Sequence, residues 1–91
     1  GLPLAAALRA QLDYARLGLA DTWLESLEPP PAMLPPRAHQ WYGSDDTFAW
    51  DPSLDLYGGG GLASPLRDMA RFTRAVMTGR VYRRAATLDT M

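Results

Sequence analysis

The sequence predicts a small, mostly helical α+β domain with three helices and one short two-stranded hairpin. Apolar residues recur at helical spacing in two segments, and a glycine that can end a helix follows each of them. Aromatic runs flank a Gly-Ser-Asp-Asp turn at 43–46, which is typical of a hairpin. The 91 residues, 47% of them hydrophobic and 21% charged, suffice for a single small domain or a fragment of one.

The first helix is predicted over residues 3–17. Pro3 suits the first helical turn, and Gly18 can adopt the left-handed conformation that ends a helix. A helix over this range would carry one apolar stripe, because four apolar residues share a face. The stripe would consist of Leu4, Leu8, Leu12 and Ala15.

The segment 21–28 and the prolines after it are predicted to form a short helix and a rigid connector. Thr22 and Glu25 have the spacing of a capping box, which indicates one or two helical turns. Residues 29–36 contain five prolines and favour extended chain without backbone donors. A ligand for an aromatic groove would have the same composition, but within a compact fold a connector is the preferred interpretation.

A hairpin is predicted over residues 37–51, with its turn at Gly43-Ser44-Asp45-Asp46. Aromatic side chains on facing strands stabilise such a pair when they lie across from one another. The residues expected to pair in this way are Trp41, Tyr42, Phe48 and Trp50.

The clearest helix is predicted over 64–78, and a shorter one over 83–90. Ser64 is a suitable N-cap, Pro65 fits the first helical position, and Asp68 adds negative charge near the positive end of the helix dipole. The helix is amphipathic, with arginines on a face separate from the apolar one. Its apolar positions are Leu66, Met69, Ala70, Thr73, Val76 and Met77.

The charge and the missing residue types exclude several classes of function. A net charge of −1 provides no excess of positive charge for nucleic acid or an anionic membrane surface, so neither is expected as a partner. All nine basic residues are arginine, and the chain contains no lysine, asparagine or cysteine. A disulfide, a thiolate zinc site and a cysteine nucleophile are therefore excluded, and we expect neither a cofactor nor a metal.

The chain shows no membrane or targeting signal, and its compartment stays undetermined. Its longest apolar run is only a few residues, and its first residues lack the basic-then-apolar pattern of a signal peptide. Gly1 is not a usual first residue, which suggests a processed chain or a piece of a longer one.

The glycine-rich loop, predicted at 57–63, is a poor candidate for phosphate binding. It leads into a helix, as phosphate loops do, but it lacks the Lys-Ser/Thr of a P-loop and the G-x-G-x-x-G spacing. Glycines also permit positive φ and close approach of the backbone to neighbouring groups or to a ligand. We therefore predict a close backbone passage.

No complete catalytic set is present. His39 is the only histidine and could act as a base, although a structural hydrogen bond in the hairpin is the preferred interpretation. Asp45 and Asp46 could bind a cation, but acidic residues beside Gly-Ser are ordinary turn residues. The serines do not lie in a G-x-S-x-G motif or three residues before a lysine; they are Ser26, Ser44, Ser53 and Ser64.

Three stretches of the chain carry a resemblance to a known family: "LGLADTW" (17–23), "RAHQWY" (37–42) and "LYGGGGLASPLRDMARFTRAVMTGRVYRRAATLDTM" (56–91). They resemble segments of the serine β-lactamase-like and penicillin-binding-protein-like hydrolases, a group of class C β-lactamases, DD-peptidases and esterases. The family reads Leu-Gly-Met-x-x-Thr in the first stretch and Arg-Ala-x-x-Tyr in the second. In the third it reads Gly-Gly-Leu-x-Ser-x-x-x-Asp-Met/Leu-Ala-Arg-Phe, followed by a helix and Gly, and this motif falls on "GGLASPLRDMARF" (60–72). The three stand in the family's order and span residues 17–91, nearly the whole chain.

The resemblance implies an internal segment of such a hydrolase, between the Tyr-x-Asn and Lys/His-x-Gly motifs. The segment would form part of the helical lobe, and the parent family is often periplasmic or secreted. The resemblance places the substrate-binding rim at Tyr57, Gly60, Gly61 and Leu62. It implies no catalytic residue here, because the chain has neither the Ser-x-x-Lys nor the Tyr-x-Asn motif.

The expected partners follow from this interpretation. They are the remainder of the parent hydrolase and, in that parent, a β-lactam, peptide or ester substrate. Apolar surface that the remainder would cover could also lead to self-association. The alternative is a stand-alone protein-interaction or scaffold module without enzymatic activity.

Overall fold

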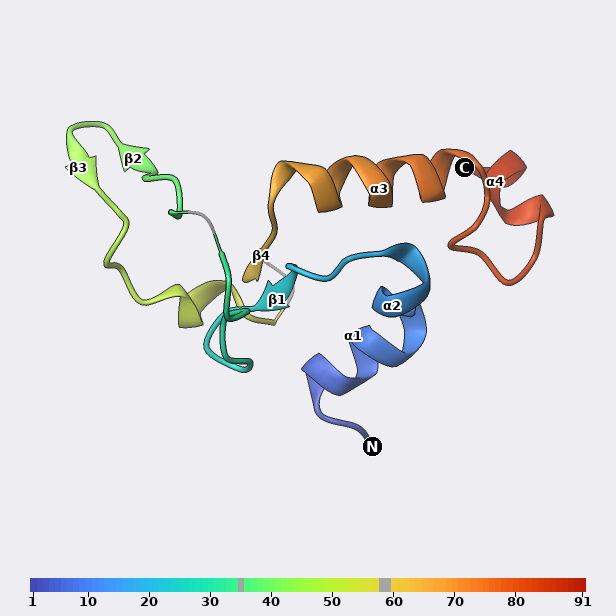
Figure 1. The fold of residues 1–91 in the computed structure, drawn as a ribbon, viewed down its shortest axis with the longest axis horizontal. Coiled ribbons are helices and arrows are strands. Elements are labelled where there is room, and N and C mark those ends of the chain that lie inside the picture. Colours follow the sequence, from blue (N-terminus) through green and yellow to red (C-terminus); the bar gives the residue numbers. More distant parts are fainter. Residues whose placement is uncertain (35, 58–59) are drawn as a thin grey trace.

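Figure 1 shows the fold as a computed structural model, which describes residues 1–34, 36–57 and 60–91. The class is α+β, with helices and two separate pairs of very short strands. The elements in chain order are α1 (Leu4–Leu12), α2 (Tyr14–Leu17), β1 (Trp23–Leu24), β2 (Trp41–Tyr42), β3 (Asp45–Asp46), the 3-10 helix η1 (Pro52–Asp55), β4 (Leu62–Ala63), α3 (Leu66–Met77) and α4 (Ala86–Thr90).

The predicted helix 3–17 is two helices, because one residue, Asp13, leaves the helical conformation. Asp13 has a left-handed conformation with φ 49°, which ends α1, and its carboxylate accepts a hydrogen bond from the Arg16 N–H at the start of α2. Aspartate is among the few non-glycine residues that tolerate this conformation. Gly18 ends α2 with φ 73°, as predicted.

The predicted helical turns in 21–28 are wrong: residues 23–24 form strand β1, a turn follows at 25–27, and no residue of this segment is helical. Trp23 and Leu24 pair antiparallel with Ala63 and Leu62 of β4. Thr22 does not cap a helix, because its hydroxyl is hydrogen-bonded to the side chains of Ser64 and Asp68. The partner strand β4 also shortens the predicted glycine-rich loop 57–63, of which residues 58 and 59 lie outside the described residues.

The hairpin exists, but its aromatic residues do not face one another. Gly43, with φ 62°, and Ser44 form the turn, so that both aspartates belong to strand β3. Trp41 therefore lies opposite Asp46, and Tyr42 opposite Asp45. The predicted cross-strand aromatic pairing is wrong because the turn closes two residues earlier than expected.

Helix α3 begins two residues later than predicted and buries a different face. Pro65 is its N-cap residue, so Ser64 makes no capping bond. The residues turned toward α2 and the core are Asp68, Phe72 and Ala75. The predicted apolar stripe is largely exposed, with side chains exposed by 83% at Leu66 and 69% at Met77.

The last helix and the proline-rich connector differ less from their predictions. The last helix is α4, shorter than the predicted 83–90, and the connector 29–36 contains no helix or strand among the residues described, Pro35 lying outside them. No described helix is both long and apolar enough to cross a bilayer.

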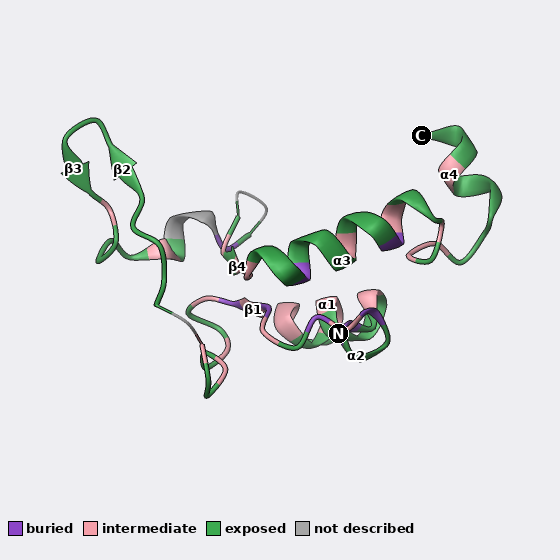
Figure 2. Ribbon diagram, turned by 45° about the horizontal axis from the view of Figure 1, so that its top comes forward, coloured by how far each residue is buried: buried purple, intermediate pink, exposed green. Residues whose placement is uncertain are grey.

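The core is small and lies where α2 packs against α3. Its buried residues are Tyr14, Leu17, Leu19 and Ala75, with Leu12, Phe72 and Val81 packed beside them. Figure 2 shows these buried segments between the two helix layers, while the hairpin is exposed almost throughout. The molecule measures 44 × 29 × 27 Å, and residues 41–57, here called the arm, project from one end of it (Figure 1).

Candidate functional site

A buried carboxylate, Asp68, joins the two halves of the chain. It lies in the first turn of α3, and its side chain is fully buried. Its Oδ2 accepts hydrogen bonds from the Asp21 N–H and from the Thr22 hydroxyl, both at 2.9 Å. The hydroxyls of Thr22 and Ser64 are also 2.9 Å apart. A charged acceptor of this kind strengthens each bond that it receives, so the loop before β1 is held on the start of α3.

Two arginines surround this carboxylate. Arg67 Nε and Arg71 Nη1 lie 3.7 and 3.8 Å from Asp68 Oδ1, which has no hydrogen-bond partner among the residues that the structure describes. Arg67 instead pairs with Asp21, and Arg71 donates to the Gly18 carbonyl at 2.8 Å. The two positive charges compensate the buried negative one, which would otherwise be costly. These residues are called the Asp68 cluster: Gly18, Asp21, Thr22, Ser64, Arg67, Asp68 and Arg71.

The glycine-rich rim rests on this cluster through strands β1 and β4. Gly61, just before β4, has φ 89° and accepts a hydrogen bond from the Glu25 N–H at 2.8 Å. A Cβ at this position would lie 3.2 Å from Leu56 and 3.4 Å from Leu24, both of them buried. Glycine is needed here for both conformation and space, as predicted for a close backbone passage.

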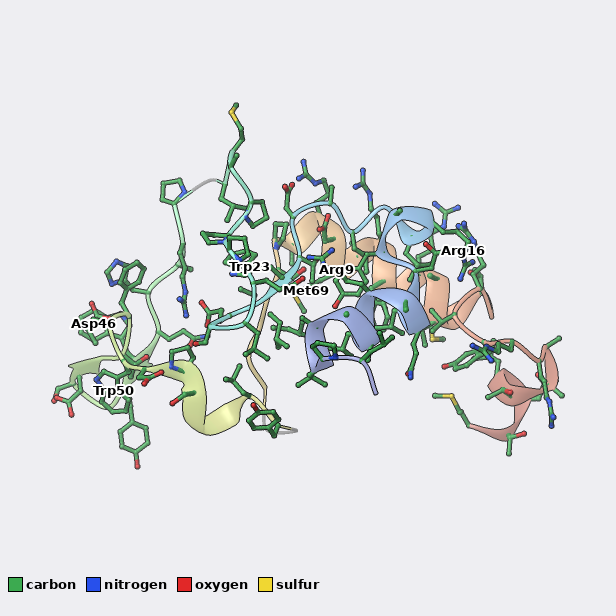
Figure 3. All side chains as sticks on the ribbon, turned by 90° about the horizontal axis from the view of Figure 1, so that it is seen from below. Arg9, Arg16, Trp23, Asp46, Trp50 and Met69 are labelled. Carbon is green, nitrogen blue, oxygen red and sulfur yellow. The ribbon has the colours of Figure 1, made fainter. Side chains whose placement is uncertain are left out.

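The rim borders an open hollow of about 1500 Å³. Apolar and aromatic side chains from β1, the arm and α3 line it; among them are Trp23, Trp41, Trp50, Leu62, Leu66 and Met69. Figure 3 shows Trp23 and Met69 near the middle of the molecule and Trp50 out on the arm. The hollow is open to solvent and larger than a typical small-molecule pocket.

The four predicted rim residues are not all brought together. Gly61 and Leu62 line the hollow, and Leu62 is half-exposed there. Tyr57 is 83% exposed at the end of the turn after η1, and Gly60 is exposed next to the two residues outside the description. Neither Tyr57 nor Gly60 belongs to the lining of the hollow.

An ion pair fixes the turn that follows β1. Glu28 pairs with Arg9 of α1, and its other oxygen accepts from the Leu24 N–H at 2.7 Å. Burial acts to raise the pKa of Glu28, but the bonds from Arg9 and Leu24 outweigh it and leave the pKa lowered. The same pair raises the pKa of Arg9, whereas burial raises that of Tyr14.

His39 has a structural setting in the arm. Its Nδ1 lies 2.6 Å from Asp46 Oδ2, and its ring stacks on Phe48 with centroids 4.2 Å apart. The Phe48 N–H and then His39 lower the pKa of Asp46. Asp46 thus orients the imidazole, but no described serine hydroxyl is bonded to it. The structural hydrogen bond expected for His39 in the hairpin is therefore present. Its partner Asp46 is not predicted from the sequence, because both aspartates are expected in the turn.

The described residues contain no group of three or more His, Cys, Asp and Glu side chains that could hold a metal ion. Sequence reasoning also missed the Asp68 cluster, since Ser64 and Asp68 were explained by helix capping and the helix dipole. The signal that could have found it is the resemblance, whose matched positions include Thr22, Ser64 and Asp68.

Comparisons of the chain with known protein families, with curated proteins and with solved structures found no match.

Proposed function

We propose that the chain is an internal segment of a serine hydrolase of the β-lactamase, DD-peptidase and esterase group. In that hydrolase it contributes part of the helical lobe and a glycine-rich rim of the substrate cleft. The nucleophile and the general base belong to the remainder of the hydrolase, which is the main partner of this segment. The substrate class is a β-lactam, peptide or ester carbonyl that forms an acyl-enzyme.

One observation carries the proposal: positions from two of the three stretches that resemble the family's motifs contact one another. Thr22 of "LGLADTW" bonds Ser64 and Asp68 of "GGLASPLRDMARF", although 42 and 46 residues separate them. Arg71 of the second stretch donates to Gly18 of the first. Residues that matched the motifs by chance would not be expected to form one hydrogen-bonded cluster. The contacts therefore support the interpretation that the two stretches form one structural unit, as the resemblance implies.

The rim role rests on where the cluster holds the backbone. Thr22 and Ser64 each stand next to a strand, β1 and β4, and their bond keeps the two strands paired. Gly61 and Leu62, at the start of β4, then border the hollow. A rim built on a buried network is more rigid than a free glycine loop, which suits the positioning of a substrate.

The experiment begins with the gene that encodes these residues. Sequencing on both sides should find Ser-x-x-Lys and Tyr-x-Asn upstream and Lys/His-x-Gly downstream. The whole protein should then react covalently with a fluorescent penicillin or turn over a short-chain nitrophenyl ester. The Ser→Ala variant of its Ser-x-x-Lys motif should lose that reaction. The 91-residue chain alone should show neither labelling nor turnover.

Two results would overturn the proposal. One is a gene without the flanking motifs. The other is saturable turnover or covalent labelling by the 91-residue chain itself, because that would require a nucleophile within it.

The alternative, a stand-alone interaction module, is favoured by the exposure of the arm. Trp41, Tyr42 and Trp50 are exposed by 64%, 75% and 59%, and aromatic side chains of this kind are enriched at protein interfaces. A gene that ends at both sides of this chain, together with a binding partner captured through the arm, would support this alternative.

A further inference from the structure

Formal charges of opposite sign gather in two separate segments of the chain. The arm, residues 41–57, contains four aspartates and no basic residue, whereas residues 74–84, here called the basic segment, contain four arginines and no acidic residue. The two therefore carry formal charges of −4 and +4. Figure 1 shows them at opposite ends of the molecule, the arm in green to yellow-green and the basic segment in orange to red.

Most of the ion pairs lie between the two ends, for example Arg9 with Glu28 and Arg67 with Asp21. Among the described side chains of the arm, only Asp46 of β3 has an ion-pair partner, the imidazole of His39. The four arginines of the basic segment are all exposed and form no ion pair there; they are Arg74, Arg80, Arg83 and Arg84. Asp45 of the arm is likewise exposed and unpaired among the described side chains.

The two ends also match in chemistry beyond charge. The arm exposes two tryptophans and two tyrosines beside its aspartates, and arginine guanidinium groups stack favourably on such rings. Aromatic residues and arginine are the types enriched at protein–protein contacts. An arm can therefore offer ion pairs and stacking to the same arginines.

We propose that two copies of this chain associate head to tail, with the arm of one copy bound to the basic segment of the other. The 44 Å length of the molecule keeps the two surfaces of one copy apart. Each contact uses unlike surfaces, so it leaves a free arm and a free basic segment, and further copies can add to form an open chain or a ring. This proposal is independent of the proposed function.

Sedimentation velocity of the 91-residue chain over about two decades of concentration tests it. At low salt the average mass should rise with concentration beyond that of a dimer. Added salt should return the chain to monomer, because exposed charges are screened within about 10 Å at 0.1 M ionic strength.

Charge reversal makes the test specific. An arm variant, Ser44→Arg with Asp45→Arg, and a basic-segment variant, Arg80→Glu with Arg83→Glu, should each associate at least about tenfold more weakly than the wild type. A mixture of the two should associate again, because each reversed surface then meets its opposite. Arg16→Glu on α2, outside both surfaces, is the control and should associate like the wild type. Circular dichroism checks that each variant keeps its helices.

Three outcomes would overturn the proposal. The wild type could stay monomeric at low salt over the whole range. The mixture of reversed variants could fail to associate. Association could also persist in high salt and in both reversed variants but be lost in Leu66→Gln with Met77→Gln, which would assign the contact to the exposed stripe of α3 instead.

Discussion

At the scale of single residues, Asp68 is the buried side chain that accepts hydrogen bonds from residues more than 40 positions away. It is fully buried, and it links positions 21 and 22 to the start of α3. A buried carboxylate without its charge partners is unfavourable, but once the partners exist its removal is costly as well. The fold therefore needs both the Asp68 carboxylate and the partners that compensate its charge.

Asp68→Ala should lower the free energy of unfolding by about 2–4 kcal/mol, because it leaves the Asp21 N–H without its acceptor, removes one of the two partners of the Thr22 hydroxyl and takes away the carboxylate that Arg67 and Arg71 face. Asp68→Asn keeps a carbonyl oxygen for these donors and should cost less. Urea denaturation followed by circular dichroism measures both. Asp89→Ala, an exposed aspartate of α4, is the charge-matched control and should change stability by less than about 0.5 kcal/mol. Equal effects at positions 68 and 89 would contradict the role of the cluster.

At Gly61, the cost of a positive φ can be separated from the cost of steric contacts made by a Cβ. Gly61→Ala should destabilise the chain by about 1 kcal/mol for its positive φ and by more for the contacts with Leu56 and Leu24. Gly79→Ala is the matched control, since its φ is 73° but a Cβ would only meet Leu88 at 3.9 Å. Thermal unfolding should rank Gly61→Ala as clearly the more destabilising. If the two were alike, the close passage at Gly61 would not be tight.

At the scale of elements, the ion pair of Glu28 with Arg9 ties α1 to the turn after β1 and gives stability a pH dependence. The pKa of Glu28 is lowered in the folded state, so the folded chain holds its proton less tightly than the unfolded chain. The contribution is complete above the ordinary glutamate pKa, about 4.3, and it is lost as the pH falls through the lower folded value.

Glu28→Gln should therefore destabilise the chain at neutral pH and flatten the loss of stability at acidic pH. Urea midpoints measured across the acidic range would show this. In an Arg9→Gln background the same substitution should have a smaller effect, since the pair is already broken. An unchanged acid profile in Glu28→Gln would show that other carboxylates dominate.

The helical state of the main segments and the two glycines that follow helices could be predicted from the sequence. Which face of a helix is buried could not. Gly18 and Gly79 stand at positive φ after their helices because their local chemistry suffices. The apolar stripe of α3, including Leu66 and Met77, satisfies the helical period but faces outward. The buried face is set instead by Asp68, whose partners lie more than 40 residues away and cannot be read from local spacing.

At the scale of the whole molecule, the chain is less compact than its length permits. Its radius of gyration is 14.9 Å, compared with about 12 Å for a compact domain of this length. The difference comes from the arm and from the exposed faces of α3 and α4, which contact little else (Figure 2). The two ends of opposite charge are therefore accessible, and the core between α2 and α3 must hold the fold largely alone.

This division predicts unequal amide hydrogen exchange, measured by NMR on dilute protein. The amides of Asp21 and Glu25 should exchange slowly although neither lies in a helix or strand, because they donate to Asp68 and to the Gly61 carbonyl. Those of Thr47 and Trp50 in the arm should exchange rapidly, since local opening there exposes little apolar surface. Asp68→Ala should remove the protection at Asp21. If arm and core were equally protected in the monomer, the arm would be part of one cooperative unit; protection of the arm that rises only with concentration would instead reflect association with a second copy.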